Sequence, residues 1–118
     1  MSRIKKAYQR LHGGDYYQYH FSKNKNVVFQ NILDMREIIE RSGSSFQVVI
    51  VPIFPAPPVT FNNYPLLDMH EEIGMFLKEN GVRSLDLYKM FAESGELPGY
   101  YSSDVWHPNA KGHRLIAG

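Results

Sequence analysis

The stretch FQVVIVPIF, residues 46–54, is a continuous apolar run rich in β-branched side chains, and it decides the fold class. An unbroken run of this kind is typical of a strand buried on both faces of a parallel sheet, whereas a half-exposed strand alternates apolar and polar residues. The run is far shorter than the ~20 residues that a membrane-spanning helix needs. We therefore expect a buried parallel strand over about residues 46–53 and no membrane span.

Helical periodicity precedes this strand. Apolar residues recur at the i, i+4, i+7 and i+11 positions of an amphipathic helix, which Asn26 can cap and Ser42-Gly43 can end. These apolar residues are Val28, Ile32, Met35 and Ile39.

A second helix and a second strand follow it. The loop PAPPVTFNNYP leads to an amphipathic helix over about residues 66–80, with Gly81 just past its end. VRSLDLY then predicts a short parallel strand over about residues 82–87. A Gly/Pro/Ser loop comes next, and Asn109 is placed to cap a final helix, AKGHRLIA.

The alternation of helices and strands is typical of an α/β protein with right-handed crossovers and helices on both sheet faces. Two strands alone would leave both sheet edges open and the apolar run uncovered. We therefore expect an incomplete flavodoxin-like, doubly wound, three-layer α/β/α fold. On this interpretation residues 1–118 are one partial domain, completed by a missing N-terminal segment or by another chain.

Residues 1–25 carry less pattern. IKKAYQRL, residues 4–11, has helical spacing and is broken by HGGD. YYQYHF, residues 16–21, puts aromatic residues on alternate positions, which is compatible with a short strand or an aromatic loop. The basic start is not followed by an apolar segment, so we predict no secretory signal in this chain.

Charge and cysteine content narrow the function classes. The net charge is +1 and the basic residues are scattered, which argues against a nucleic-acid partner. Without cysteine there is no disulfide and no thiolate metal site. We expect a soluble protein, and the sequence does not indicate its compartment.

Asp104 and His107 lie on the loop after the second predicted strand, where doubly wound sheets bind their ligands. A carboxylate three residues before a histidine can accept its Nδ1–H, so that Nε2 faces outward as a general base. Pro108 disfavours helical geometry at His107, and Trp106 offers apolar bulk that could shield the pair from water. The alternative is a pair of surface residues or a hydrogen bond at the start of a helix.

The block DVWHPNAKGHRLIA, which begins at Asp104, resembles the last sequence block of the SGNH hydrolases, also called GDSL esterases and lipases. Its pattern is Asp-x-x-His, then Pro, Asn and a helix containing Gly-His. VVIVPIFP and VRSLDLYKMF resemble the preceding family elements in order and spacing, so the resemblance covers about residues 26–117.

The resemblance implies an ester substrate, no cofactor and no metal, with His107 activating a serine nucleophile and Asp104 orienting the imidazole. Trp106 is a candidate substrate contact. The family's Gly-Asp-Ser and Gly-x-Asn-Asp motifs are absent, and Gly14-Asp15 is followed by Tyr16. The nucleophile is therefore not identified in this chain. Ser102 and Ser103 would have to double back to reach Nε2.

Several alternatives stay open. His70, beside two glutamates, could bind a metal, although a solvated helix face is the simpler interpretation. His113 is badly spaced from His107 for a shared metal and more simply packs or forms a hydrogen bond within the last helix. In function, the chain is either the C-terminal part of a serine ester hydrolase, or an inactive remnant that binds or self-associates, or part of an O-acyltransferase with the same triad.

Overall fold

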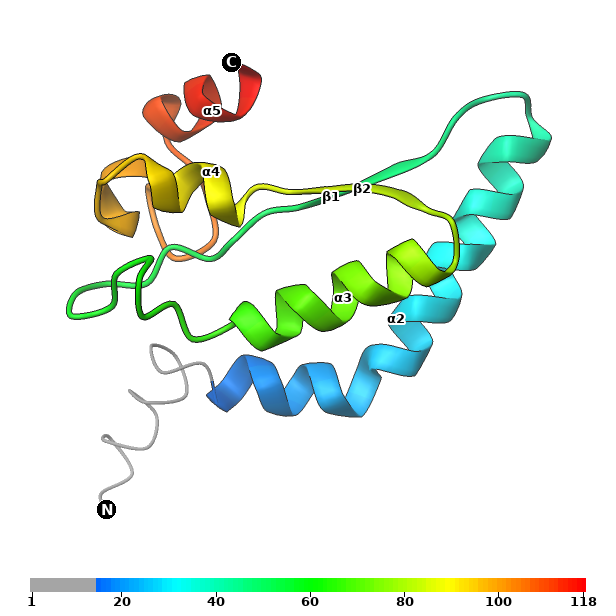
Figure 1. The fold of residues 1–118 in the computed structure, drawn as a ribbon, viewed down its shortest axis with the longest axis horizontal. Coiled ribbons are helices and arrows are strands. Elements are labelled where there is room, and N and C mark those ends of the chain that lie inside the picture. Colours follow the sequence, from blue (N-terminus) through cyan, green and yellow to red (C-terminus); the bar gives the residue numbers. More distant parts are fainter. Residues whose placement is uncertain (1–14) are drawn as a thin grey trace. The chain divides into compact units, whose positions relative to one another are not determined.

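The computed structural model describes residues 15–118, so the helix predicted over residues 4–11 lies outside the described residues. Helices and strands alternate along the chain (Figure 1), which is compatible with the α/β class. The elements are α2 (Asp15–Arg41), β1 (Gln47–Ile50), α3 (Leu67–Glu79), β2 (Arg83–Asp86), α4 (Tyr88–Glu93), the 3₁₀-helix η1 (Pro98–Tyr101) and α5 (Ala110–Ala117).

Helix α2 is longer than the sequence pattern predicted. It spans 27 residues, and YYQYHF forms its first turns, so the interpretation of this segment as a strand or loop was wrong. The reason is that Tyr17 and Phe21 are four residues apart. This separation fits the alternation of a strand, and it also places two side chains on one face of a helix. The predicted stop is confirmed, because Gly43 has a φ of 87° and its N–H donates to the Glu40 carbonyl.

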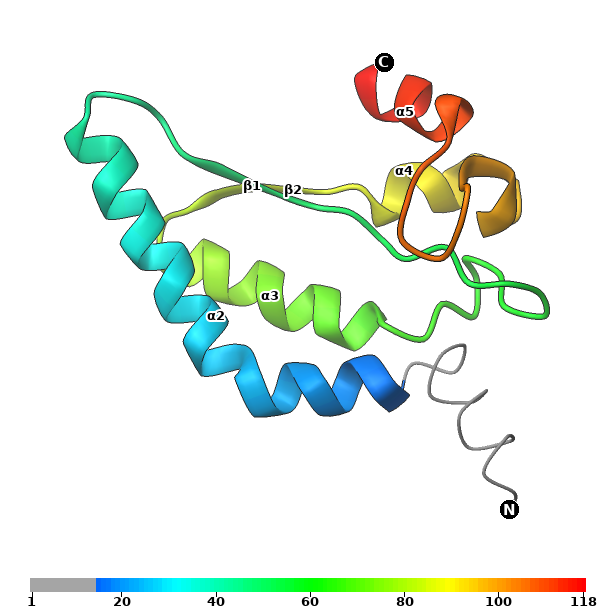
Figure 2. The same cartoon turned by 180° about the vertical axis from the view of Figure 1, so that it is seen from behind.

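Strands β1 and β2 pair in parallel as a two-stranded open sheet, and both are shorter than predicted. The apolar run is not buried on both faces within the described part of the chain. Val48 and Ile50 are half-buried, whereas Val49 and Val51 remain 49% and 43% exposed. Within the first unit, helices α2 and α3 lie on the same side of the strands in both ribbon views (Figures 1 and 2).

The described chain divides into two compact units, and the first comprises residues 15–49 and Leu66–Leu85. Here the rings of Phe29 on α2 and Phe76 on α3 stack with centroids 4.0 Å apart, and Leu77 is fully buried. Lys25 pairs with Glu72 at 2.7 Å across the same two helices. The helix predicted over residues 66–80 is thus confirmed, and its apolar face packs on α2.

The second unit comprises Ile50–Pro65 and Asp86–Gly118. Phe91 on α4 is fully buried at its centre, where it contacts the rings of Phe54, Phe61 and Tyr101. The predicted loop after β1 is irregular, and Tyr88 anchors it by donating its hydroxyl hydrogen to the Phe61 carbonyl. The second unit therefore holds the segment that carries Asp104 and His107 against a packed aromatic core.

Candidate functional site

The candidate site lies on the loop between η1 and α5, and the two ends of this loop are held together. The Ser103 N–H donates to the His107 carbonyl at 2.8 Å, and Ser102 forms an antiparallel bridge with Pro108. Further out, the Asn109 N–H donates to the Tyr101 carbonyl at 2.8 Å. Backbone hydrogen bonds therefore define the loop before any side chain of the pair is considered.

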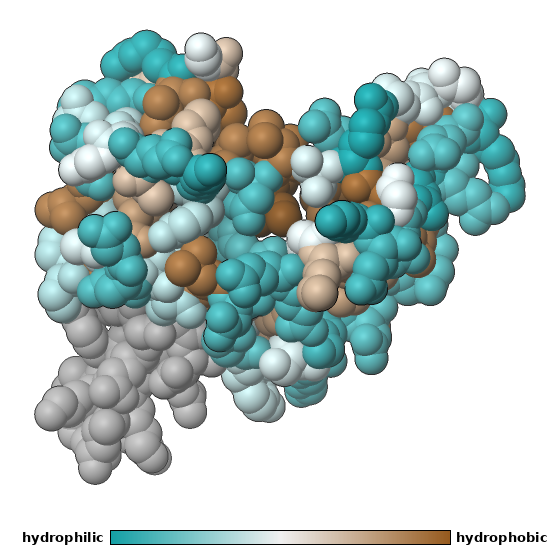
Figure 3. Space-filling view, viewed as in Figure 1, coloured by the Kyte–Doolittle hydropathy of each residue, from teal (hydrophilic) through white to brown (hydrophobic). Residues whose placement is uncertain are grey.

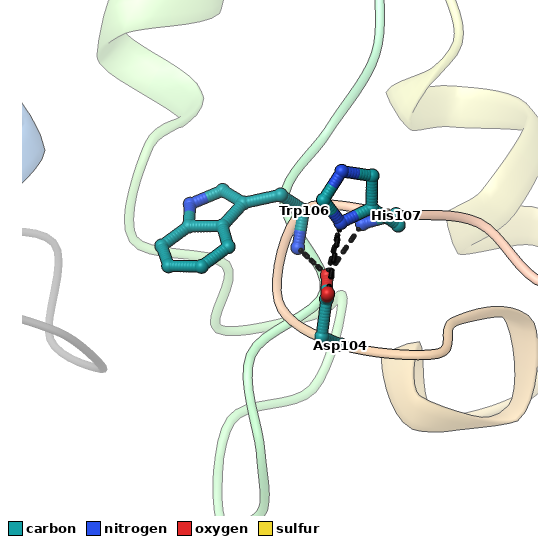
Figure 4. Close-up of polar contacts among 3 residues, drawn as sticks. All are labelled: Asp104, Trp106 and His107. Carbon is teal, nitrogen blue, oxygen red and sulfur yellow. Dashed lines mark hydrogen bonds and ion pairs between the residues drawn. The ribbon is translucent and has the colours of Figure 1, made fainter.

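The Asp104 carboxylate binds both the backbone and the ring of His107 (Figure 4). Its Oδ1 accepts from the backbone N–H groups of Trp106 and His107 at 2.8 Å each. The Nδ1 atom of His107 lies 2.8 Å from Oδ1 and also 2.8 Å from Oδ2. Because an ionised carboxylate can only accept, Nδ1 carries the proton in this contact.

The second ring nitrogen of His107 points away from this network. Within residues 15–118, no side chain forms a hydrogen bond with Nε2. With the proton on Nδ1, the neutral imidazole presents the Nε2 lone pair outward. The geometry expected from the Asp-x-x-His spacing is therefore present, and the outward atom is able to accept a proton.

The same contacts set the charge of Asp104. The hydrogen bond from the His107 side chain is the largest cause that holds the pKa of Asp104 below its ordinary value of 3.8, followed by the bond from the Trp106 backbone. The partial loss of water around the carboxylate opposes this lowering and is outweighed. Asp104 is therefore ionised at neutral pH and available to hold Nδ1–H.

The loop is also attached to the segment that follows β1. The Phe54 N–H donates to the Val105 carbonyl at 2.8 Å, and Phe54 packs against Phe91 in the core. Val105 lies between the two residues of the pair in the sequence. The aromatic core of the second unit therefore supports the middle of the loop as well as its ends.

Trp106 does not shield the pair within the described residues. Its indole ring points away from the imidazole (Figure 4), and the residue is 56% exposed. The side chain of His107 is 72% exposed. The Trp106 backbone N–H donates to Asp104, and its ring lies on the other side of the loop from the imidazole, so shielding of His107 by Trp106 stays a prediction.

The neighbouring serines form no side-chain hydrogen bond with His107 within residues 15–118. Ser103 contacts it through backbone N–H and carbonyl groups, and no hydroxyl of Ser102 or Ser103 is hydrogen-bonded to the ring in the described chain. That neither serine reaches Nε2 stays a prediction.

Within residues 15–118, the other histidines do not assemble a metal site. His70 is only 6% exposed, so its assignment to a solvated helix face was wrong: α3 turns this position inward. His113 is exposed on α5. No group of three histidine, aspartate or glutamate side chains within residues 15–118 is close enough to hold a metal ion.

Two supports of the site were missed by the sequence reasoning. One is the Val105 carbonyl, and the other is the Asn109 side chain, which donates to the Tyr100 and Ser102 carbonyls besides capping α5. Backbone acceptors leave no signal in a sequence. The only available signal was an asparagine placed directly after His107-Pro108.

A strand-helix-strand unit followed by a loop with a hydrogen-bonded Asp-His pair is an arrangement found in α/β hydrolytic enzymes. The chain belongs to the GDSL-like Lipase/Acylhydrolase family, whose model matches residues 14–118. This membership bears out the resemblance in the sequence, and it supports ester substrates in general. No curated protein and no solved structure matches the chain. None of the described helices has the length and apolar character to span a bilayer.

Proposed function

We propose that this chain is the C-terminal part of a serine ester hydrolase, in which His107 is the general base and Asp104 orients it. The proposal rests on the 2.8 Å contact between Nδ1 of His107 and the Asp104 carboxylate. This contact leaves Nε2 facing outward and without a side-chain partner in the described residues. Membership of an acylhydrolase family supports the same reaction class.

In the proposed reaction Nε2 takes the hydroxyl proton of a serine, while the serine oxygen bonds to the ester carbonyl carbon. The bond to the leaving alcohol then breaks, and the imidazolium returns the proton to that alcohol, which leaves an acyl-enzyme. Water repeats the sequence and releases the acid, with Nε2 again accepting and returning one proton. Asp104 stabilises the imidazolium through Nδ1–H in both halves of the reaction.

The serine and the oxyanion donors are proposed to come from a segment outside residues 1–118, because the sequence contains neither Gly-Asp-Ser nor Gly-x-Asn-Asp. The exposure of His107 supports such a segment, since a triad works best when water is excluded. The apolar side chains of Val49, Val51 and Leu85 are also exposed, which supports completion of the sheet as a three-layer α/β/α fold.

The test uses the open reading frame that joins an upstream Gly-Asp-Ser segment to this chain. We expect His107→Ala to lower kcat/KM for a p-nitrophenyl ester by about 10⁴-fold or more. His113→Ala, which removes an exposed histidine on α5, is the matched control and should retain activity. Full activity of His107→Ala would overturn the assignment.

The isolated 118-residue chain offers a second arm. We expect no stoichiometric adduct with a fluorophosphonate probe by intact mass. A stoichiometric adduct that His107→Ala abolishes would mean that a serine of this chain is the nucleophile, which contradicts the proposal that it lies elsewhere.

The exposed apolar residues also favour a second candidate, an inactive module that binds or self-associates. Apolar side chains reach the surface on the face drawn in Figure 3, and Val49 and Leu85 of the sheet are about half exposed. Sedimentation at micromolar concentration separates the cases, because a monomeric chain argues against self-association. Product analysis with added alcohols tests the O-acyltransferase alternative, which differs only in the acceptor of the acyl group.

A further inference from the structure

Asn109 uses every polar group it has within the second unit. Its backbone N–H donates to the Tyr101 carbonyl at 2.8 Å, and its Oδ1 accepts from the Gly112 N–H at 3.0 Å. Its Nδ2 donates to the Tyr100 carbonyl at 3.0 Å and, at 3.4 Å, to that of Ser102. The residue therefore joins the start of α5 to the chain that enters the loop.

These bonds serve two different purposes. The bond from Gly112 caps α5, and for that purpose a serine or aspartate would serve equally well. The bonds from Nδ2 need a donor that neither of those caps supplies in the same geometry. They tie Asn109 to the end of η1 and to Ser102. Ser102 also forms the backbone bridge with Pro108.

We propose that Asn109 is a positioning residue, whose side-chain amide fixes the loop so that the His107 imidazole stays on Asp104 with its proton on Nδ1. The inference rests on the proposed function for its catalytic meaning, while the geometry it concerns is measurable in this chain alone. Without the Nδ2 bonds, the entering and leaving ends of the loop are joined by backbone hydrogen bonds alone and are held less firmly. The Ser103 bond to the His107 carbonyl then weakens, and the ring loses its fixed orientation.

The test variant is Asn109→Ser, which keeps the oxygen that caps α5 and removes the amide donor. Asn109→Asp also keeps a capping oxygen and removes the amide donor, so it replaces the serine variant if that variant does not fold. Asn31→Ser, on the exposed surface of α2, is the matched control. Two readouts are taken by NMR on the 118-residue chain, in a buffer alkaline enough to keep imidazoles neutral. They are the ratio of Nδ1–H to Nε2–H tautomers of His107, from its ring ¹⁵N shifts, and amide exchange at Ser103 and Gly112.

We expect the tautomer ratio to fall about fivefold in Asn109→Ser, the factor that one ordinary hydrogen bond represents. Exchange at Ser103 should become faster, while Gly112 keeps its protection because the cap is retained. Asn31→Ser should change none of these values. If either the tautomer ratio or Ser103 exchange is unchanged in a folded variant, Asn109 is a helix cap and nothing more, and the proposal is overturned.

Failure of the proposed function gives a different result. The tautomer ratio depends on neither the serine nor an ester, so a change in Asn109→Ser supports the positioning role by itself. Retained esterase activity in His107→Ala would overturn the catalytic assignment and leave this positioning role intact.

Discussion

Gly112 on α5 lies directly against the carbonyl oxygen of Tyr101, so that a Cβ at this position would overlap the oxygen and lie 2.9 Å from the Pro108 Cβ. Both neighbours belong to the loop that carries Asp104 and His107 or to its boundary. A glycine is needed here because backbone, rather than a flexible side chain, occupies the space. Because Gly112 has no side chain, the first turn of α5 can lie against Tyr101 while its N–H donates to the Asn109 side chain.

The Gly112→Ala variant should therefore be less stable, by about 1–3 kcal/mol, as expected for overpacking against a rigid neighbour. Urea unfolding followed by circular dichroism measures the difference. Gly74→Ala is the matched control, because that glycine is within α3 and a methyl group added there would meet nothing within 4 Å. There we expect stabilisation by about 0.5–1 kcal/mol. Equal effects of the two substitutions would contradict the packing of α5 on Tyr101.

Phe91 should be the most sensitive position in the second unit. Its side chain is fully buried among Phe54, Phe61 and Tyr101, so Phe91→Ala removes ring contacts and leaves a cavity. We expect a loss of about 3–5 kcal/mol in the free energy of unfolding. Met75→Ala, at a residue that is 63% exposed, should change it by no more than about 0.5 kcal/mol. A comparable loss in both variants would show that the ring cluster is not a core.

The stabilising effect of Asp104 should depend on pH in one direction. Because the His107 bond lowers the pKa of Asp104 in the folded state, the ionised form favours folding. The contribution is fully present above the ordinary value of 3.8 and is lost as the pH falls through the lowered pKa. The difference in urea midpoint between the natural chain and Asp104→Asn should therefore narrow in acid. A difference that stays constant on acidification would contradict the hydrogen-bonded pair.

The stacked rings of Phe29 and Phe76 should contribute a measurable coupling between α2 and α3. Their centroids are 4.0 Å apart and their planes differ by 5°. A double-mutant cycle with Phe29→Leu and Phe76→Leu should give a coupling free energy of about 0.5–1.5 kcal/mol. The same cycle with Phe29→Leu and exposed Met75→Leu should give a value near zero. Absence of coupling in the first cycle would mean that the rings do not pack on each other in solution.

Local patterns predicted much of the fold because they depend on few neighbours. The helix after Leu66 and the final helix follow from apolar spacing and from the glycine or asparagine at their ends. The contact between Asp104 and His107 was also predictable, since three residues of chain restrict where the carboxylate can go. The catalytic role of this pair and the three-layer completion of the sheet stay predictions.

Other features depend on groups far apart in the sequence. The aromatic residues 16–21 are compatible with more than one local structure. In the folded chain they are helical, and the rings of Phe21 and Phe29 on α2 lie with their centroids 6.0 Å apart. The lengths of β1 and β2 and the exposure of Val49 depend on what covers the sheet, which no local pattern states. The placement of His70 in a buried position likewise follows from how α3 packs.

The sequence by itself thus determined the alternation of helices and strands, the end of α2 near Gly43, the helix after Leu66, the final helix and the local Asp-His contact, because each depends on residues within a few positions of one another. Only the tertiary structure decided that the Val105 carbonyl binds Phe54 and that the Asn109 amide joins η1 to α5. Those bonds use backbone acceptors, which every residue possesses, so their partners are chosen by the packing around Phe91 and Gly112 and not by residue type.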